Sequence, residues 1–325
     1  MRAVVVNNSQ SGLDDLVLIE MKEPEIVQSD DVKVRVSYAS INPVDYKLIA
    51  HHPQLWQYPY VVGLDIAGEV VDVGNSCQRI KIGDRVAVHG DLSFGGALAE
   101  YVVHPEHVLY KVPSQVGLDV AAATPCAGLT AYLALVRKMN IQAGKTILIQ
   151  GGSGGVGGFA IIIAKALGLH VITTCSVRNF DYVKNLGADV VLDYRNNDVY
   201  EEIKKLYPGG VDYILETTNK ENLQRDLSIL AFNGHIASIV GILDTISITE
   251  FVSGFSFHEV ALGGAYLSGH YLSQCDLHYM GDELFGILKG LAVTPAIYEY
   301  ELSNYKQAFT DLQLNANSGK IVISI

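Results

Sequence analysis

Short apolar stretches rich in valine make up much of the first 120 residues. Apolar and polar positions alternate within them, and glycine-containing turns such as Gly83-Asp84 and Gly95-Gly96 separate one stretch from the next. A period of two residues is typical of strands that bury one face, and short turns between them favour antiparallel pairing. The pattern predicts a β domain with strands at 3–6, 32–38, 68–73, 85–89 and 100–103.

The pattern changes near residue 122, where short apolar runs begin to alternate with longer segments of helical period. After a predicted helix at 121–138, we expect strands at 146–150, 171–175, 190–192, 211–216 and 235–240, and helices at 155–167, 179–186, 199–206 and 220–230. Regular alternation of strand and helix with short connections indicates βαβ units, and therefore a parallel sheet.

The last segment is mixed, with predicted helices at 276–291 and 305–314 and extended stretches at 296–301 and 320–325. We interpret it as the chain re-entering the first domain. The predicted fold class is therefore α/β in two domains: a discontinuous β-rich domain at 1–121 and 270–325, and a parallel-sheet domain at 122–269.

Composition narrows the class of protein. The 325 residues are 49% apolar and 18% charged, which is enough apolar material for two cores. A net charge of -12 argues against nucleic acids and anionic membranes as partners. Mean hydropathy is positive, at +0.23, but runs such as 157–169 fall short of the roughly 20 residues that a membrane span needs.

The four cysteines are scattered and form no CxxC pair, so neither a zinc ribbon nor a disulfide framework is indicated. Free thiols are typical of a reducing compartment, and the first residues read as a strand rather than a signal peptide. We therefore expect a cytoplasmic protein.

A glycine cluster follows the predicted strand at 146–150. Gly152, Gly154 and Gly157 satisfy G-x-G-x-x-G, and an apolar helix follows at once. Such a turn lets backbone N–H groups and a helix N-terminus face a pyrophosphate, which predicts a dinucleotide site formed by Gly152, Ser153, Gly154, Gly155, Val156 and Gly157. The alternative is a tight turn without a ligand. A P-loop is excluded because Gly144-Lys145-Thr146 precedes a strand and Met139 stands where its first glycine belongs.

The end of the next strand bears on the choice of dinucleotide. NAD sites place an acidic residue there, whereas this chain has Ser176 and Arg178. A guanidinium would pair with a 2′-phosphate, so the residues favour NADP(H). The alternative is that Arg178 is only a solvated residue at a helix entry.

Several segments together resemble the medium-chain dehydrogenase/reductase superfamily: residues 42–47 (NPVDYK), 63–68 (GLDIAG), 83–86, 95–101, 125–132 (PCAGLTAY), 152–157, 185–189 and 319–322. In order and spacing they are similar to its zinc-free quinone oxidoreductase branch, which includes zeta-crystallin and the enone reductases. The resemblance implies a GroES-like catalytic domain, a doubly wound Rossmann domain and an active site in the cleft between them.

The superfamily's zinc-dependent alcohol dehydrogenases bind catalytic zinc through a Cys, a His-Glu pair and a second Cys. Matched motif by motif, those positions hold Asn42, Leu64, Asp65 and Cys126. Leucine has no donor atom, so we expect that three protein ligands cannot meet there and that no metal is bound. We interpret His104-Pro105-Glu106-His107 as surface.

The resemblance also implies site residues. Lys47 would lie near the nicotinamide and substrate as an electrostatic or proton-donating group, with Tyr46 shaping the pocket and Asn42 and Asp45 orienting the nicotinamide ribose or Lys47. The alternative is a surface ion pair between Asp45 and Lys47. Further cofactor contacts are expected at Thr130, Ser176, Arg178, Tyr194, Gly241 and Lys320.

The predicted function is NADPH-dependent, zinc-independent reduction of quinones or α,β-unsaturated carbonyls by a homodimer. A zinc-type alcohol dehydrogenase with displaced ligands and a non-catalytic NADPH-binding protein are the alternatives. The aromatic stretch His51, His52, Trp56, Tyr58 and Tyr60 could stack on a substrate or could be a packed loop. The acceptor and the one- or two-electron course stay open.

Overall fold

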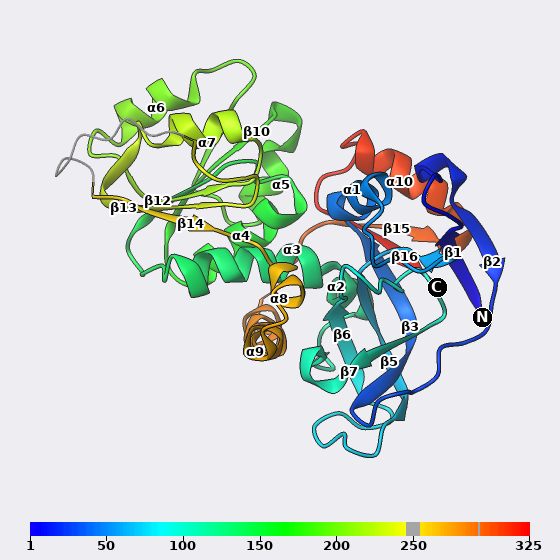
Figure 1. The fold of residues 1–325 in the computed structure, drawn as a ribbon. Coiled ribbons are helices and arrows are strands. Elements are labelled where there is room, and N and C mark those ends of the chain that lie inside the picture. The colour runs from blue at the N-terminus through cyan, green and yellow to red at the C-terminus, as the bar shows by residue number, and fades with distance from the viewer. Residues whose placement is uncertain (245–253, 292) are drawn as a thin grey trace. The chain divides into compact units, whose positions relative to one another are not determined.

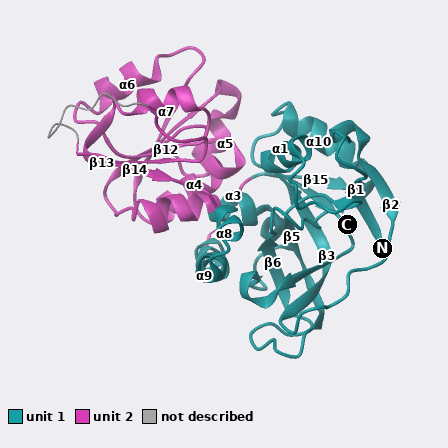
Figure 2. Cartoon of the chain, viewed as in Figure 1, with its two compact units in different colours: residues 1–129, 263–290, 296–325 teal, residues 130–262, 291–295 magenta. Residues whose placement is uncertain are grey.

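The computed structural model describes residues 1–244, 254–291 and 293–325. The chain forms two compact units (Figure 2): unit 1 contains residues 1–129, 263–290 and 296–325, and unit 2 contains 130–262 and 291–295. The chain leaves unit 1 after residue 129, returns at residue 263, and leaves it again for the short segment 291–295. The divisions fall after residues 129 and 262, against the predicted 121 and 269.

Unit 1 contains a seven-stranded sheet in the order β15-β16-β3-β5-β6-β8, with β7 also paired to β3 (Figure 1). The pairs are antiparallel except β15 with β16. The strands are β3 (Asp31–Ile41), β5 (Asp65–Val73), β6 (Arg85–His89), β7 (Tyr101–Pro105), β8 (Tyr110–Lys111), β15 (Ile297–Glu301) and β16 (Lys320–Ser324).

A smaller sheet in the order β2-β1-β4 completes the strands described in unit 1: β1 (Arg2–Val6), β2 (Val17–Glu20) and β4 (Tyr60–Val61). The longer helices of unit 1 are α1 (Pro43–His51), α2 (Leu118–Ala123), α9 (Tyr271–Leu288) and α10 (Tyr305–Gln313), and α8 (Gly264–Leu267) is a single turn. The predicted period of two is seen in β3, where Val32, Val34 and Val36 are buried while Lys33 is half-buried and Arg35 exposed. In β1, by contrast, Ala3 to Val6 are all buried.

Unit 2 contains a six-stranded sheet in the order β11-β10-β9-β12-β13-β14, and every pair is parallel. The strands are β9 (Thr146–Ile149), β10 (His170–Cys175), β11 (Val190–Asp193), β12 (Val211–Glu216), β13 (Leu230–Ser238) and β14 (Ser256–Glu259). The chain winds outward from β9 in one direction and then returns to wind in the other. The winding reverses beside β9, so the predicted glycine cluster lies at the topological switch point.

The helices of unit 2 are α4 (Gly155–Ala166), α5 (Phe180–Asn185), α6 (Val199–Leu206) and α7 (Lys220–Asp226). Because the winding reverses, right-handed crossovers place α4 and α5 on one face of the sheet and α6 and α7 on the other (Figure 1). One buried core lies under α6 and α7, and includes Leu148, Ile172, Ile214 and Ile236.

The largest departure from the sequence prediction is the helix expected at 121–138. In the structure this range is divided among the end of α2, the helix α3 (Pro125–Tyr132) and a π-helical stretch at Leu133–Lys138. Pro125 lacks the N–H that would continue the hydrogen bonds of α2, which ends that helix. The strand β14 and helix α1 were also not predicted as elements. Within the described ranges, no helix is both long and apolar enough to cross a membrane.

Candidate functional site

The glycines of the turn between β9 and α4 differ in whether packing inside the protein requires them. A Cβ on Gly152 would lie 2.0 Å from the Thr173 hydroxyl, and one on Gly157 would lie 2.3 Å from the Gly151 carbonyl oxygen. Packing inside the protein therefore requires glycine at both. Gly154 differs, because its Cβ would meet nothing closer than 3.5 Å and its φ is -78°. The chain itself does not require glycine at this exposed position.

The N-terminus of α4 lies directly after this turn. Gly154 is its N-cap, so no side chain caps the helix, and the N–H groups of Gly155, Val156 and Gly157 have no intrahelical acceptor. Free N–H groups at the positive end of a twelve-residue helix bind phosphate oxygens. The residues therefore fit the pyrophosphate of a dinucleotide. No atom of the chain prevents a side chain at position 154, so a closely bound ligand would explain why glycine stands there.

Three of the predicted cofactor residues follow two neighbouring strands. Cys175 at the end of β10 pairs with Asp193 at the end of β11, so Ser176 and Tyr194 leave the sheet side by side. Ser176 is buried at the start of a 3₁₀ turn that carries Arg178 on its exposed side. The parallel register thus brings this set to one edge of unit 2.

Sequence reasoning missed a second cation at this edge. The Arg195 guanidinium lies 5.8 Å from the centre of the Tyr194 ring, and its Nε donates to the Tyr194 hydroxyl at 3.4 Å. Asp193 is buried, and its two oxygens accept from the Arg195 N–H and the Asn196 amide, so this carboxylate is already engaged. The cluster of positive charge beside an occupied carboxylate fits an anionic group.

The remaining predicted cofactor residues lie on other elements of the chain. Gly241 follows β13 at the same end of the parallel sheet and has a φ of 144°, a backbone conformation that favours glycine. Thr130 is buried in α3, at the start of unit 2. Lys320 lies in unit 1 and is buried there.

Four adjacent strands of unit 1, in the order β16-β3-β5-β6, bring polar residues to one edge of the sheet. Ile321 pairs with Ile41, Ser40 pairs with Asp65, and Asp65 pairs with His89. Residues paired across antiparallel strands point to the same face, so the ends of these strands converge.

We call the result the unit 1 polar cluster; it consists of five buried side chains and the half-buried Cys126: Asn42, Asp45, Asp65, His89, Cys126 and Lys320. Asn42 is the N-cap of α1, and Pro43 occupies the first helical position, where its missing N–H costs nothing. The Asn42 N–H donates to Asp45 Oδ2 at 2.6 Å, the capping-box bond that fixes the start of α1.

Asp65 is the hub of the unit 1 polar cluster. Its Oδ1 accepts from His89 Nδ1 at 2.8 Å, and its Oδ2 accepts from Asn42 Nδ2 at 2.8 Å and from the Cys126 N–H at 2.9 Å. Lys320 Nζ donates to Asn42 Oδ1. The Asn42 amide therefore bridges a buried lysine and a buried carboxylate, which sets the orientation of both.

Asp45 has a different environment from Asp65. Its Oδ1 is buried and has no hydrogen-bond partner among the described residues. Burial, and then the charge of Asp65, raise the pKa of Asp45 to about 8. At neutral pH this carboxyl group is therefore mostly protonated, which limits the negative charge that the cluster must hold.

Two of the predicted catalytic residues are not in the unit 1 polar cluster. Lys47 is exposed on α1 and Tyr46 is half-buried, while Asn42 and Asp45 lie at the helix start. The alternative of a surface ion pair between Asp45 and Lys47 is wrong, because Asp45 is only 3% exposed. The capping box instead fixes α1 and so determines where Lys47 and Tyr46 project.

A possible metal site needs a separate test, because Asp65, His89 and Cys126 bring ligand atoms within 4.8 Å of one another. The expectation that three donors cannot meet here was wrong: Leu64 offers none, but His89 on β6 supplies an imidazole that the motif comparison did not include.

Two of these three donors, His89 and Asp65, form a hydrogen bond with each other. Two atoms bound to one zinc ion at about 2.0–2.1 Å in a tetrahedral arrangement lie about 3.3 Å apart, whereas His89 Nδ1 and Asp65 Oδ1 are 2.8 Å apart. Desolvation, and then Asp65, raise the pKa of the Cys126 thiol well above its usual value, which disfavours the thiolate that zinc requires. The Lys320 cation adds repulsion. The residues present do not fit a resident zinc ion.

The aromatic stretch of unit 1 is largely packed. Trp56 stacks on Tyr60 with ring centres 3.7 Å apart and planes at 11°, and both donate to the Leu92 carbonyl. The His52 ring nitrogen and the Tyr58 hydroxyl are 3.2 Å apart. These contacts favour the packed loop over a free stacking platform for this stretch.

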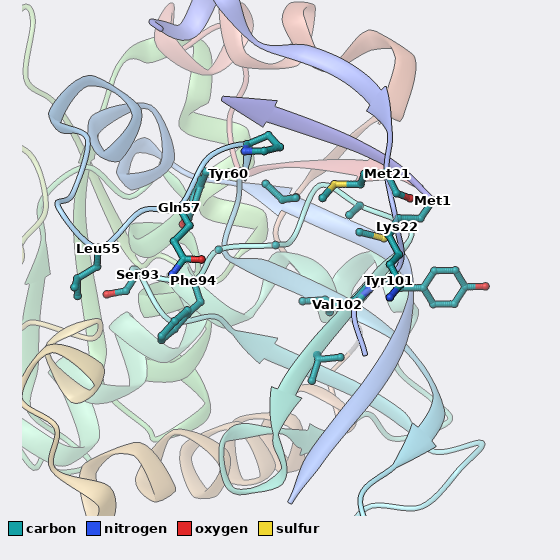
Figure 3. A pocket seen from close by; sticks show the side chains of 17 residues that line it. Met1, Met21, Lys22, Leu55, Gln57, Tyr60, Ser93, Phe94, Tyr101 and Val102 are labelled. Carbon is teal, nitrogen blue, oxygen red and sulfur yellow. Dashed lines mark hydrogen bonds between the residues drawn. The ribbon is translucent and has the colours of Figure 1, made fainter. Parts of the chain in front are cut away.

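A cavity of about 350 Å³ opens beside this loop (Figure 3). Leu55, Gln57, Tyr60 and Phe94 lie on one side of it, and Met1, Met21 and Lys22 on the other. The cavity is formed by unit 1 alone.

His104 corrects another expectation. The string His104 to His107 was predicted to be surface, but His104 is 6% exposed because it lies on β7 opposite Val32. Burial lowers its pKa to about 4, so the ring is neutral at physiological pH. His107 is half-buried, and its Nε2 lies 2.9 Å from the Gln274 side-chain oxygen.

Comparison with known families matches both units. Residues 28–114 match the alcohol dehydrogenase GroES-like domain, and residues 155–280 match the family described as zinc-binding dehydrogenase. The second description implies zinc, which the donor geometry above does not fit.

Among relatives, a chloroplastic quinone-oxidoreductase homologue of Spinacia oleracea is 40% identical over 203 residues, which is 60% of this chain and 61% of that protein. A trans-enoyl reductase of Aspergillus terreus is 39% identical over 191 residues, 55% of this chain and 53% of that protein. The chain thus matches little more than half the length of these relatives. Human quinone oxidoreductase is 34% identical over 227 residues, 69% of this chain and 68% of that protein.

Solved structures of related proteins can be superimposed on this chain over its whole length. A quinone oxidoreductase of Pseudomonas syringae is 25% identical with a TM-score of 0.85, and covers 100% of this chain and 99% of its own. A mycobacterial protein solved with NADPH is also 25% identical with a TM-score of 0.85, and covers 100% of both chains. The GroES-like unit, the Rossmann unit and these relatives establish that the chain belongs to the medium-chain dehydrogenase/reductase superfamily, in its quinone oxidoreductase branch.

Proposed function

We propose that the protein is an NADPH-dependent, zinc-independent oxidoreductase that reduces quinones or α,β-unsaturated carbonyls. The observation that carries the proposal is the glycine turn, where Gly154 is free of internal packing and the N-terminus of α4 has no side-chain cap. When bound, the nicotinamide supplies the hydride. The relatives named for quinone and enoyl reduction support the substrate class.

The edge formed by β10 and β11 supports NADPH over NADH. Arg178 and Arg195 place positive charge beside Ser176 and Tyr194, and the Asp193 carboxylate is buried and hydrogen-bonded. A 2′-phosphate would gain charge-assisted hydrogen bonds at this edge, which a ribose hydroxyl would not. The mycobacterial structure solved with NADPH is consistent with this choice.

In unit 1, Lys47 is proposed to stabilise negative charge that develops on the carbonyl oxygen of the acceptor. Its side chain is exposed and α1 is held at its start by Asn42 and Asp45, so the cation projects from a fixed helix. Tyr46 on the same helix would shape the pocket. Thr130, Gly241 and Lys320 remain predicted cofactor contacts, and the homodimer and the cytoplasmic location remain proposals.

The substrate proposal is tested by following NADPH oxidation across a panel of quinones, enals and enones. Turnover with at least one class is expected, and Lys47→Ala should lower turnover without changing NADPH affinity. Binding of NADPH without turnover on any acceptor would instead support the non-catalytic alternative. Metal analysis of the purified protein accompanies the screen, since about one zinc ion per chain would contradict zinc independence.

Gly154→Ala is expected to weaken NADPH binding about tenfold or more and to leave the fold intact. The new methyl group meets no atom of the chain closer than 3.5 Å, but it points where the dinucleotide phosphates are proposed to lie. Fluorescence titration with NADPH measures the affinity, and thermal unfolding of the apo protein measures stability.

Gly152→Ala is the matched control in the same turn. Its methyl group would lie 2.0 Å from the Thr173 hydroxyl, so the apo protein itself should lose stability. Undiminished NADPH affinity in Gly154→Ala would show that the turn does not contact the cofactor.

A further inference from the structure

A network of buried polar side chains lies directly under the glycine turn of unit 2. Gln150 follows β9 and is 3% exposed. Its Oε1 accepts from the Thr174 hydroxyl at 2.8 Å, and that hydroxyl accepts in turn from the Gly151 N–H at 3.0 Å. A series of hydrogen bonds thus connects the Gln150 side chain, through the Thr174 hydroxyl, to the backbone N–H of Gly151, the first residue of the turn.

The other end of this chain is a buried carboxyl group. Gln150 Nε2 donates to Asp226 Oδ1 at 3.0 Å, and the Tyr200 hydroxyl donates to the same oxygen at 3.2 Å. Asp226 is fully buried at the end of α7, close to a second buried acid, Glu216, at the end of β12. One oxygen of each acid, Asp226 Oδ2 and Glu216 Oε2, is buried without a hydrogen-bond partner among the described residues.

Glu216 fixes the neighbouring loop. Its Oε1 accepts from the N–H and hydroxyl of Thr218 and from the Asn219 N–H. Thr217, in the same loop, donates to the Gln150 carbonyl at 2.6 Å. The loop after β12 and the glycine turn after β9 are therefore joined through both the side chain and the backbone of Gln150.

We infer that Asp226 is a positioning residue for dinucleotide binding, which acts through Gln150 and Thr174 to hold the Gly151 N–H and so the turn that begins there. The inference rests on the proposed function, because it assigns the glycine turn to a dinucleotide. Asp226 reaches the turn only through the other two side chains, so its effect is on geometry rather than on the reacting atoms.

The arrangement needs one proton on the acid pair. Two neighbouring buried carboxyl groups with no cation between them are stable only when one of them is neutral. Burial, and then the negative charge of Glu216, raise the pKa of Asp226 well above its usual value. Glu216 Oε1 already accepts three hydrogen bonds, which favour its charged form, so we assign the proton to Asp226. Asp226 Oδ1 then accepts from Gln150 and Tyr200.

Asparagine has the same shape and the same donor and acceptor as a protonated aspartate. Asp226→Asn is therefore expected to keep the Kd for NADPH within about twofold of the wild type, whereas Asp226→Leu should raise it about tenfold. With an active acceptor, Asp226→Leu should raise the KM for NADPH and leave kcat at saturation nearly unchanged.

Thr174→Val is a second variant that removes only the hydroxyl linking Gln150 to Gly151, and suits the case in which Asp226→Leu fails to fold. It should raise the Kd for NADPH about tenfold. Hydrogen exchange of the peptide covering 150–154 in the apo protein should become faster in Thr174→Val and stay unchanged in Asp226→Asn. This second readout does not depend on the cofactor.

The pH dependence gives an independent signature. The groups that face Asp226 are Glu216 from β12 and Tyr200 from α6, and the Arg225 guanidinium lies 4.0 Å from the centre of the Tyr200 ring. Because the pKa of Asp226 is raised in the folded protein, the neutral form is present below that pKa. As the pH rises through it, two buried carboxylates face each other, and their repulsion should loosen the support. Protection of 150–154 should fall over that pH range in the wild type and much less in Asp226→Asn.

The outcomes separate the inference from the proposed function. Unchanged exchange at 150–154 in Thr174→Val, or equal loss of NADPH affinity in Asp226→Asn and Asp226→Leu, would overturn the positioning role. A wild-type protein that shows the expected exchange pattern but does not bind NADPH would overturn the dinucleotide assignment and with it the role of Asp226 in binding.

Discussion

Asp65→Ala is expected to lower the free energy of unfolding by about 3–5 kcal/mol. The carboxylate is completely buried and is the acceptor for His89, Asn42 and the Cys126 N–H. Alanine leaves all three donors unsatisfied and removes the negative charge nearest to Lys320 in the hydrogen-bond chain. Urea unfolding followed by circular dichroism measures the change.

Glu69→Ala on the same strand is the matched control. Glu69 forms an ion pair with Arg35 at 3.1 Å in which both side chains are about half exposed, so its loss should cost no more than about 1 kcal/mol. Asp65→Asn should fall between the two, because it keeps one acceptor oxygen. A loss below 1 kcal/mol for Asp65→Ala would show that the unit 1 polar cluster does not contribute to stability as proposed.

Arg178→Ala is expected to raise the Kd for NADPH about 10- to 100-fold while the Kd for NADH changes less than about twofold. The guanidinium is exposed at the end of β10 and would pair with the 2′-phosphate, which NADH lacks. The difference between the two cofactors should shrink with added salt, since the pairing is electrostatic and the site is open to solvent. Titrations with both cofactors at two ionic strengths measure it.

The control for Arg178→Ala removes an exposed cation from a different helix. Lys204→Ala on α6 breaks an exposed ion pair with Glu201 and should change neither affinity. Arg195→Ala tests the second cation of the same edge and should also weaken NADPH binding, since it removes a positive charge beside Tyr194. Equal weakening of NADPH and NADH binding by Arg178→Ala would remove its role in cofactor choice.

Unit 2 could be predicted from the sequence because its signals are local. The strand at 146–149, the glycines that follow it and the apolar helix α4 are consecutive, and packing alone requires Gly152 and Gly157. Ser176 could be found because it follows a predicted strand, and Tyr194 through the family resemblance; the parallel pairing of β10 and β11 brings the two to the same edge. The support from Asp226 could not, since α7 and β9 meet only after the sheet has formed.

Unit 1 shows the opposite case. Asn42 and Asp45 were found because they are neighbours in one motif, whereas His89, 24 residues beyond Asp65, was missed. Lys320 was expected at the cofactor, but its contact with Asn42, 278 residues earlier, was not predicted. Only the register of β16-β3-β5-β6 brings them together. The motif comparison considered only the positions of the family's zinc ligands. It therefore recorded that Leu64 has no donor atom and did not include the imidazole of His89.

The position of β16 in the unit 1 sheet has a consequence for synthesis. This strand pairs with β3, whose residues leave the ribosome almost 300 positions earlier, and the whole of unit 2 is made in between. Until β16 arrives, Asn42 lacks the Lys320 cation and β3 lacks its partner at an unpaired edge. The sheet of unit 1 therefore stays incomplete until unit 2 has been synthesised, and β16 then brings the Lys320 cation to Asn42, which donates to the buried carboxylate of Asp65.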